Sequence, residues 1–205
     1  MNEHYFSATP SGDSQRQVIE VQLAGKPVRV ETAGGIFSPD GLDRGTRVLL
    51  DTVPNPPVTG NFLDLGSGWG PIALTLGLLA PQAQVTAVEV NERAADLTRA
   101  NATRLGLSNV DVQHPDEVAI HRRFDLIWSN PPIRIGKAAL HEILSRWLPT
   151  LNPGGQAWLV VAKKLGADSL LPWISSMLES EYPGEFTASR AATAKGFRVL
   201  RIERF

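Results

Sequence analysis

A glycine-rich segment followed by a distant carboxylate has the residue types and spacing of a nucleoside-binding site. Gly66, Ser67, Gly68 and Gly70 follow a short apolar run, and Glu89 ends the next one. Glycines let the backbone turn tightly and let a ligand approach the main chain. Glu89 lies about 20 residues after the last glycine, where a carboxylate can accept hydrogen bonds from two ribose hydroxyls. The pattern therefore predicts a ligand that contains a ribose.

Two features of this glycine loop argue against a dinucleotide and favour a cationic ligand. Pro71 stands where the dinucleotide fingerprint needs its third glycine. Asp64 precedes the first glycine by two residues, and its carboxylate would repel a pyrophosphate but attract an amino group. S-adenosylmethionine carries a sulfonium and an α-amino group and no phosphate, so it is the predicted cofactor. The alternative is a tight strand-to-helix turn without a ligand, which leaves the matched Glu89 unexplained.

A second candidate site is the sequence Asn130-Pro131-Pro132, at the end of the fourth strand predicted after residue 60. The two prolines fix the backbone and remove two amide donors, which leaves the Asn130 side chain and the Pro131 carbonyl as acceptors. Two such acceptors would orient an aromatic amine so that its nitrogen lone pair points at a methyl group. Catalysis would then rest on proximity and alignment, without a strong base. A rigid turn with no catalytic role is the alternative.

Alternating apolar and turn-forming segments predict the elements that must position these residues. Residues 18–23 and 27–31 are expected to form a hairpin, followed by a helix over 41–51 and a proline-rich linker over 54–60. From residue 61 strands alternate with helices, which predicts a parallel sheet covered on both faces. The expected strands are 61–65, 84–90, 110–113, 124–128, 156–162, 185–190 and 196–203, and the expected helices are 71–79, 91–105, 137–148 and 169–178.

The predicted fold is α/β, a doubly wound and mostly parallel seven-stranded sheet with an antiparallel last strand, preceded by an N-terminal β-hairpin. The last two strands are antiparallel because only a short loop separates them. This is the Rossmann-like shape of class I methyltransferases, in which ligands bind outside the carboxyl ends of the strands. We expect one domain over residues 1–205, with an N-terminal extension over 1–60 and a cofactor-binding and catalytic core over 61–205.

Composition restricts the partners. The chain has 205 residues with 20 Lys and Arg against 21 Asp and Glu, so any nucleic-acid contact must come from a local patch. The absence of cysteine excludes disulfides and thiolate zinc sites, and the four histidines lack metal-ligand spacing. The first 17 residues lack the apolar core of a signal peptide, and no apolar run is long enough to span a bilayer. A soluble, cytoplasmic protein without a metal site is expected.

The segment 64–70 resembles the first motif of class I S-adenosylmethionine-dependent methyltransferases, and the resemblance extends over about residues 61–164. It implies that Glu89 binds the cofactor ribose and that Asn91 flanks the ribose or the adenine. It also implies an acidic residue against the adenine amino group; Asp116 is the best match, although a plain loop carboxylate is the alternative because Glu117 lies beside it. The residues implied to surround the methionine end of the cofactor are Asp64, Gly66, Ser67, Gly68 and Gly70.

Residues 130–133 resemble the N-methyltransferase motif, in which Asn or Asp precedes two prolines and usually Phe or Tyr. The resemblance implies a catalytic role for Asn130, Pro131 and Pro132. Ile133 departs from the motif, since the usual aromatic residue stacks on the target base, a contact worth about 1–3 kcal/mol for each base. Ile133 would still pack against the substrate.

Two N-terminal segments, His4-Tyr5-Phe6-Ser7 and residues 37–46, are similar to the ribosomal RNA small subunit methyltransferase C family, which methylates guanine N2. The similarity implies small-subunit ribosomal RNA, free or in the subunit, as the partner. Tyr5 and Phe6 would supply the stacking surface that Ile133 lacks, or form a mobile tail. Bacterial members often carry a degenerate second domain upstream, for which 205 residues leave no room.

Residues 37–46 and the cations near the predicted strand ends allow two interpretations each. Phe37, Asp43 and Thr46 would close over the cofactor, or form an ordinary helix entry capped by Asp43. The cations would contact RNA phosphates or carry solvated loop charge. These cations are Arg134, Lys137, Lys163, Lys164, Arg190 and Lys195.

Three other functions stay open at this point. DNA adenine N6 and a protein glutamine amide can use the same acceptor geometry as guanine N2. A degenerate methyltransferase domain that only binds RNA or a protein partner is the non-catalytic alternative. The joint presence of Asp64, Glu89 and Asn130 argues against that last reading.

Overall fold

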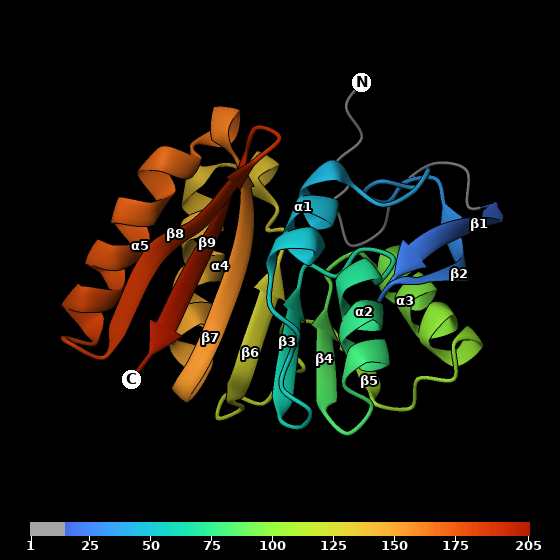
Figure 1. Ribbon diagram of the computed structural model, residues 1–205, viewed down its shortest axis with the longest axis horizontal. Coiled ribbons are helices and arrows are strands. Elements are labelled where there is room, and N and C mark those ends of the chain that lie inside the picture. Colours follow the sequence, from blue (N-terminus) through green and yellow to red (C-terminus); the bar gives the residue numbers. More distant parts are fainter. Residues whose placement is uncertain (1–14) are drawn as a thin grey trace. The chain divides into compact units, whose positions relative to one another are not determined.

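The computed structural model describes residues 15–205, so the expectations for Tyr5 and Phe6 lie outside the described residues (Figure 1). Among these residues the seven-stranded α/β fold and the N-terminal hairpin are confirmed. The strands are β1 (Arg16–Leu23), β2 (Lys26–Ala33), β3 (Asn61–Leu65), β4 (Gln84–Val88), β5 (Val110–Gln113), β6 (Phe124–Ser129), β7 (Leu151–Ala162), β8 (Phe186–Ala194) and β9 (Phe197–Arg204). The α-helices are α1 (Arg44–Thr52), α2 (Pro71–Leu79), α3 (Glu92–Arg104), α4 (Lys137–Trp147) and α5 (Ala167–Glu181), and the short 3-10 helices are η1 (Ile133–Ile135), η2 (Leu148–Thr150) and η3 (Lys163–Leu165).

The larger sheet has the strand order β5-β4-β3-β6-β7-β9-β8, and β1 and β2 form a separate two-stranded sheet. Strands β3, β4 and β5 pair in parallel, as do β6 and β7. The last strand, β9, is antiparallel to both β7 and β8 and lies between them. The predicted antiparallel last strand is therefore confirmed, and it is an inner strand of the sheet.

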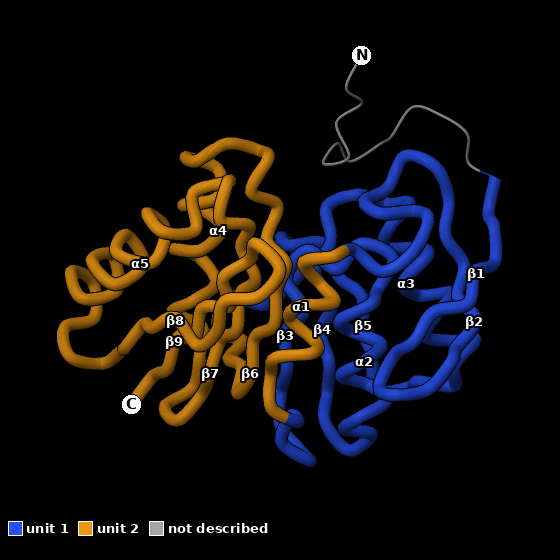
Figure 2. Tube along the Cα trace, turned by 45° about the horizontal axis from the view of Figure 1, so that its top comes forward, with its two compact units in different colours: residues 1–43, 55–119 blue, residues 44–54, 120–205 orange. Residues whose placement is uncertain are grey.

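The chain divides into two compact units (Figure 2). The first unit comprises residues 1–43 and 55–119, and the second comprises residues 44–54 and 120–205. The short segment 44–54, which contains α1, thus packs with elements that lie far from it in the chain, from residue 120 onward. This division assigns the glycine loop to the first unit and Asn130 to the second.

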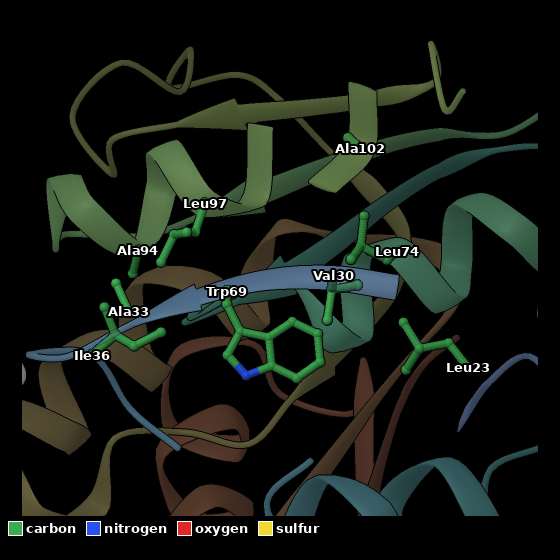
Figure 3. Close-up of a cluster of buried hydrophobic side chains, with 9 residues drawn as sticks. All are labelled: Leu23, Val30, Ala33, Ile36, Trp69, Leu74, Ala94, Leu97 and Ala102. Atoms are coloured by element: carbon green, nitrogen blue, oxygen red, sulfur yellow. The ribbon is translucent and has the colours of Figure 1, made fainter. Parts of the chain in front are cut away.

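The hairpin of the first unit is closed by a two-residue turn at Ala24 and Gly25. Both residues have positive φ, 52° and 74°, which is the backbone twist that best matches two antiparallel strands. Val30 on β2 and Leu23 on β1 are fully buried, and they pack in one apolar cluster with Trp69 of the glycine loop. Figure 3 shows the Trp69 indole beside Val30. The hairpin therefore covers the outer side of the glycine loop, and its apolar residues account for that position.

Asn101 on α3 ties the hairpin to the glycine loop with a fully buried amide group. Its Oδ1 accepts a hydrogen bond from the Glu31 backbone N–H at 2.6 Å, and its Nδ2 donates to the Glu31 carbonyl at 2.9 Å. The same Nδ2 donates to the Trp69 carbonyl at 3.1 Å. One side chain thus satisfies backbone groups of both β2 and the loop, which would be costly to bury without partners.

In the second unit, helices pack on the sheet formed by β6, β7, β9 and β8. Helix α1 contacts β7 and β9, whereas α5 contacts β8, β9 and α4. In the view of Figure 1, α4 lies behind β7. The buried residues of α1 include Thr46, Val48 and Leu49, so the side of the helix that carries Thr46 faces the unit's interior.

Several boundaries differ from the predictions by a few residues, and two of the differences have a clear physical reason. The helix expected from residue 41 begins at Arg44, because Gly41 has a φ of 150° and its carbonyl accepts a hydrogen bond from the Ser38 hydroxyl. The strand expected from residue 156 begins at Leu151. Its sequence Pro-Gly-Gly over residues 153–155 reads as a turn, and it forms an irregular stretch of β7 beside Phe124 on β6.

Replacing Asn101 with alanine is expected to destabilise the protein by about 2–4 kcal/mol, because three hydrogen bonds are lost and Glu31 backbone groups are left buried without partners. Urea unfolding monitored by tryptophan fluorescence measures the change. Thr103→Ala, an exposed position on the same helix, is the control and should change stability little. Equal unfolding midpoints for Asn101→Ala and the control would contradict the assignment.

Candidate functional site

The glycine loop is a tight strand-to-helix turn built from residues in left-handed conformations. Gly66, Gly68 and Gly70 have φ of 78°, 58° and 100°, which side-chain-bearing residues adopt only at a cost. The backbone N–H groups of Gly66 and Ser67 both donate to the Val88 carbonyl, at 2.9 and 3.1 Å. The end of β4 therefore holds the start of the loop.

Two of these glycines face different surroundings. A Cβ added at Gly70 would lie 2.9 Å from the methyl carbon of Thr98, so glycine allows α3 to approach the loop closely. The Thr98 hydroxyl also donates to the Gly68 carbonyl at 2.8 Å. At Gly68, by contrast, an added Cβ would meet no atom of residues 15–205 within 4 Å. The loop therefore packs on α3 at Gly70 and leaves its main chain open at Gly68.

The Glu89 carboxylate organises the loop and the turn that follows β4. Its Oε2 accepts a hydrogen bond from the Gly68 N–H at 2.8 Å. Its Oε1 accepts from the N–H groups of Val90 and Asn91, both at 2.9 Å. Burial raises the pKa of Glu89 above its ordinary value, and the three backbone hydrogen bonds act in the opposite direction. The residue predicted to bind a ribose thus also fixes the backbone beside it.

Asp64 is fully buried at the end of β3. Its Oδ2 accepts a hydrogen bond from the Ala73 N–H at 2.8 Å, in the first turn of α2. Burial raises the pKa of Asp64 to about 8; the Ala73 hydrogen bond lowers it and the charge of Glu89 raises it further. Its Oδ1 has no hydrogen-bond partner among the described residues, and within the same residues the buried Ser67 hydroxyl has none. These two atoms are the polar groups that an amino-bearing ligand could satisfy.

Asn91 has a structural role at the start of α3 that the sequence pattern did not indicate. Its side chain accepts a hydrogen bond from the Ala94 N–H at 3.1 Å, as an N-cap does, and it is 1% exposed. Its Nδ2 donates to the Gly35 carbonyl at 3.3 Å. Contact with a ribose or adenine, as the resemblance implies, stays a prediction for this residue.

The segment 34–41 is held against the first unit by side chains from three positions. Besides Asn91, Arg93 donates to the Gly34 carbonyl at 2.8 Å, and the Trp69 indole N–H donates to the Ser38 carbonyl at 3.2 Å. Phe37 in the middle of this segment is 41% exposed. The glycine loop and the start of α3 therefore carry a fixed segment that presents one exposed aromatic side chain.

The two candidate carboxylates after β5 differ in their surroundings. The Asp116 side chain is 77% exposed and lies 3.6 Å from the His114 ring nitrogen. The Glu117 carboxylate accepts a hydrogen bond from the His114 N–H at 2.8 Å and so closes the turn. Both residues are exposed, and contact between Asp116 and the adenine amino group stays a prediction.

The Asn-Pro-Pro segment follows the end of β6. Pro132 has φ and ψ of −75° and 68°, and the Ile133 N–H donates to the Pro131 carbonyl at 2.8 Å, which together form an inverse γ-turn. The Pro131 carbonyl thus already accepts one hydrogen bond, and only its second lone pair can serve a ligand. The Asn130 Nδ2 donates to the Thr46 hydroxyl at 3.1 Å. Thr46, for which closure over the cofactor or an ordinary helix entry was predicted, thus contacts the asparagine.

The predicted substrate-binding cations of the second unit are exposed and come close in two groups. Arg134 and Lys137 lie on η1 and at the start of α4. Lys195 lies in the turn between β8 and β9 with a φ of 51°. The Lys163 N–H donates to the Gly196 carbonyl at 2.9 Å, which brings the two lysines of η3, at positions 163 and 164, beside this turn.

Across residues 15–205, no cluster of three or more His, Asp or Glu side chains could hold a metal ion. None of the helices that the structure describes is both long and apolar enough to cross a membrane.

Two residues that shape these sites were not singled out from the sequence. These residues are Trp69 and Thr98, which support the glycine loop. The position of Trp69 between two loop glycines could have indicated its role, because a large apolar residue there has to be buried somewhere. Thr98 carries no such signal in the sequence.

Comparison with known proteins agrees with this arrangement. The sequence matches the methyltransferase small domain family over residues 27–201. The uncharacterized protein YbxB of Bacillus subtilis is 32% identical over 207 residues, covering 100% of both chains. Ribosomal RNA small subunit methyltransferase C of Pseudomonas entomophila is 30% identical over 206 residues, which are 98% of this chain and 58% of that protein. The chain thus spans less than two thirds of the length of that relative.

Two solved structures have a similar fold. The T. thermophilus 16S rRNA N2 G1207 methyltransferase, in complex with AdoMet and guanosine, superposes with a TM-score of 0.74 at 22% identity, covering 93% of this chain and 51% of that one. A methyltransferase from Pyrococcus furiosus superposes with a TM-score of 0.62 at 25% identity, covering 81% and 85% of the two chains. The first likeness, at its low identity, concerns the fold alone.

The buried Asp64 predicts a specific pH dependence of stability. The unfolded chain loses this proton near pH 4, whereas the folded protein keeps it up to a pKa of about 8. Between these values the folded state binds more protons, so its free energy of unfolding falls as the pH rises. Asp64→Asn cannot titrate, and its stability should vary less steeply between pH 4 and 8 than that of the wild type.

Urea unfolding at pH 5, 6, 7 and 8 measures the two slopes. Asp51→Asn, which changes an exposed carboxylate, should leave the wild-type slope unchanged. A slope for Asp64→Asn equal to that of the wild type would contradict the assignment of the buried proton.

Proposed function

The chain belongs to the methyltransferase small domain family, whose cofactor is S-adenosylmethionine, and we propose that it is an N-methyltransferase acting on the exocyclic N2 amine of a guanine in small-subunit ribosomal RNA. The observation that carries the proposal is the turn at Asn130, where an amide side chain and two prolines follow the end of β6. The glycine loop of the first unit supports it, since the loop suits a cofactor that is cationic and contains a ribose.

The residues of the glycine loop fit S-adenosylmethionine on three structural grounds. The unpartnered Oδ1 of Asp64 can accept a hydrogen bond from the cofactor's amino group, and the Ser67 hydroxyl is also unpartnered within the described residues. The open face of the loop at Gly68 lets a ligand approach the main chain. Glu89 is already aligned by three backbone amides, so its remaining lone pairs are available to ribose hydroxyls.

The proposed catalytic role of Asn130 is to hold and orient the target amine. Its side-chain carbonyl oxygen accepts one N–H of the amine, and the second lone pair of the Pro131 carbonyl accepts the other. When bound, the cofactor supplies a methyl group on a positively charged sulfur, which leaves with the electrons of its bond to that carbon. The acceptors favour a pyramidal amine nitrogen with its lone pair aligned for attack. Asn130 requires no change of charge, since the methylated amine loses its proton readily.

The proposed substrate is supported by a relative and by the surface of the second unit. The Pseudomonas entomophila relative is named a ribosomal RNA methyltransferase and aligns with 98% of this chain. The exposed Arg134, Lys137 and Lys195 can contact backbone phosphates, which position an RNA without reading its sequence. Ile133 would pack against the target base, which must be unpaired or flipped to reach the site. The cytoplasm, where ribosomes assemble, is the expected location.

Glu89 variants test the cofactor site. Glu89→Ala removes the proposed hydrogen bonds between the ribose hydroxyls and a charged group, each worth about 1.5–3 kcal/mol. The binding free energy of S-adenosylmethionine and of S-adenosylhomocysteine should therefore weaken by at least the value of one such bond. The loss of the Gly68 contact should lower thermal stability as well. Calorimetric titration measures the affinities, and nicotinamide and flavin dinucleotides should not bind. The exposed Glu92→Gln is the control, and a variant at Glu89 that binds as tightly as this control would remove Glu89 from the site.

Asn130 variants test the reaction. Asn130→Ala should reduce single-turnover methyl transfer to ribosomal RNA about a hundredfold or more, because the amine is no longer aligned. Asn130→Asp should retain partial activity, because a carboxylate still accepts hydrogen bonds from the amine. Cofactor affinity should change little in both variants, because the contacts proposed for the methionine and ribose ends of the cofactor come from Asp64, Ser67 and Glu89.

Mass mapping of methylated nucleotides, on free RNA and on assembled small subunits, identifies the product. N2-methylguanine at a single position supports the proposal. Methylation of DNA adenine or of a protein glutamine by the wild type, with no product on RNA, would replace guanine as the substrate. An Asn130→Ala protein that transfers methyl groups at the wild-type rate would reduce the Asn-Pro-Pro segment to a structural turn.

A further inference from the structure

The Asn130 side chain is held by a residue from a distant part of the chain. Its Nδ2 donates a hydrogen bond to the Thr46 hydroxyl at 3.1 Å. Thr46 lies in the first turn of α1 and is 3% exposed. Both residues belong to the second unit, in which the short segment 44–54 joins residues 120–205 (Figure 2). The contact is therefore internal to one compact unit, although 84 residues separate its partners.

The placement of Thr46 follows from the packing of α1. The helix buries Gly45, Val48 and Leu49 together with Thr46, and it contacts β7 and β9. Strand β7 pairs in parallel with β6, whose last residue directly precedes Asn130. A helix of nine residues with several buried side chains cannot rotate or slide without exposing them, so the Thr46 hydroxyl has a fixed position.

This hydrogen bond distinguishes the two ends of the Asn130 amide. A side-chain amide carries a carbonyl acceptor and an NH2 donor of nearly the same shape, and a half-turn exchanges them. With Nδ2 directed at Thr46, Oδ1 takes the opposite direction. The reversed amide would present N–H groups to the N–H groups of an amine substrate, which repel each other. The hydrogen bond thus selects the orientation that can accept from an amine.

The backbone that follows Asn130 is restricted, so the direction of its amide depends on the rotation of the side chain. Pro131 and Pro132 have fixed φ, and the inverse γ-turn is closed by the Ile133 N–H. An amide that rotates freely would spend much of its time in orientations that misplace the amine, and an error of about 1 Å can cost a hundredfold in rate.

We propose that Thr46 is a positioning residue for methyl transfer, which holds the Asn130 amide with its carbonyl oxygen toward the target amine; the inference rests on the proposed function. Thr46 acts through Asn130 and does not touch the substrate amine. Its hydroxyl oxygen is the group required, and its methyl group contributes packing. A threonine that served only to pack α1 would be replaced without loss by valine, which has nearly the same shape.

Variants at Thr46 separate these two roles. Thr46→Val keeps the shape and removes the acceptor, so kcat should fall about tenfold to a hundredfold with little change in cofactor affinity. Thr46→Ser keeps the hydroxyl and should restore most of the wild-type kcat. Thr52→Val is the matched control on the same helix, because the Thr52 hydroxyl donates a hydrogen bond to the Val48 carbonyl within α1 itself. This control should retain wild-type activity.

A double variant tests whether Thr46 acts through Asn130. If it does, Thr46→Val combined with Asn130→Ala should transfer methyl groups as slowly as Asn130→Ala alone and no slower. Multiplied losses would overturn the inference, as would a wild-type kcat for Thr46→Val. Equal losses for Thr46→Val and Thr46→Ser would assign the effect to packing and overturn it as well.

Nuclear magnetic resonance supplies a readout that does not depend on activity. The side-chain amide resonances of Asn130, assigned by their absence in Asn130→Ala, should shift in Thr46→Val and remain near the wild-type positions in Thr46→Ser and Thr52→Val. Unchanged Asn130 resonances in Thr46→Val would overturn the inference even if kcat fell. Failure of the proposed function would give a different result, because the wild-type protein would then methylate no amine in RNA.

Discussion

The hydrogen bonds that the Glu89 carboxylate accepts from three backbone N–H groups are the interaction on which the candidate cofactor site depends. Glycines in left-handed conformations have many alternatives in an unfolded loop, so the loop needs a strong local restraint to keep one shape. A carboxylate supplies that restraint, since hydrogen bonds to a charged acceptor are stronger than those between neutral groups. The Gly68 bond fixes the loop, and the Val90 and Asn91 bonds fix the entry to α3. Removing the charge would loosen two turns at once.

The first unit builds a second restraint around the same loop from apolar packing and one buried amide. Trp69 enters the cluster formed by the hairpin and the helices, and Asn101 joins the Trp69 carbonyl to the backbone of β2. The loop is thus restrained by the hydrogen bond between Glu89 and the Gly68 N–H and by the packing of Trp69 against the hairpin. This arrangement gives the N-terminal hairpin a function in the fold, because it covers the tryptophan that the loop cannot bury alone.

In the second unit, the Asn-Pro-Pro turn and its neighbours restrict the direction of a neutral side chain, that of Asn130. In the proposed function Asn130 carries no charge that would attract a substrate, so the direction of its carbonyl oxygen decides whether it can accept a hydrogen bond from an amine. Two prolines and the inverse γ-turn restrict the backbone, and the hydrogen bond to Thr46 orients the Asn130 amide. The first unit differs, because its buried Asp64 is a titratable group. Burial raises the pKa of Asp64 to about 8, and one of its carboxyl oxygens has no hydrogen-bond partner among the described residues.

The sequence alone determined the order and type of the elements, the seven-stranded sheet and its antiparallel last strand, because these follow from local hydrophobic patterning and from short loops. It also located both motifs, since glycine and proline act on the backbone wherever they stand. The tertiary structure decided which side chains support these motifs. Thr46 and Asn130 are 84 residues apart, and Glu31 and Asn101 are 70 apart, so no local pattern links them. Their contacts exist because buried polar groups must find partners, and only the folded chain determines which partners are within reach.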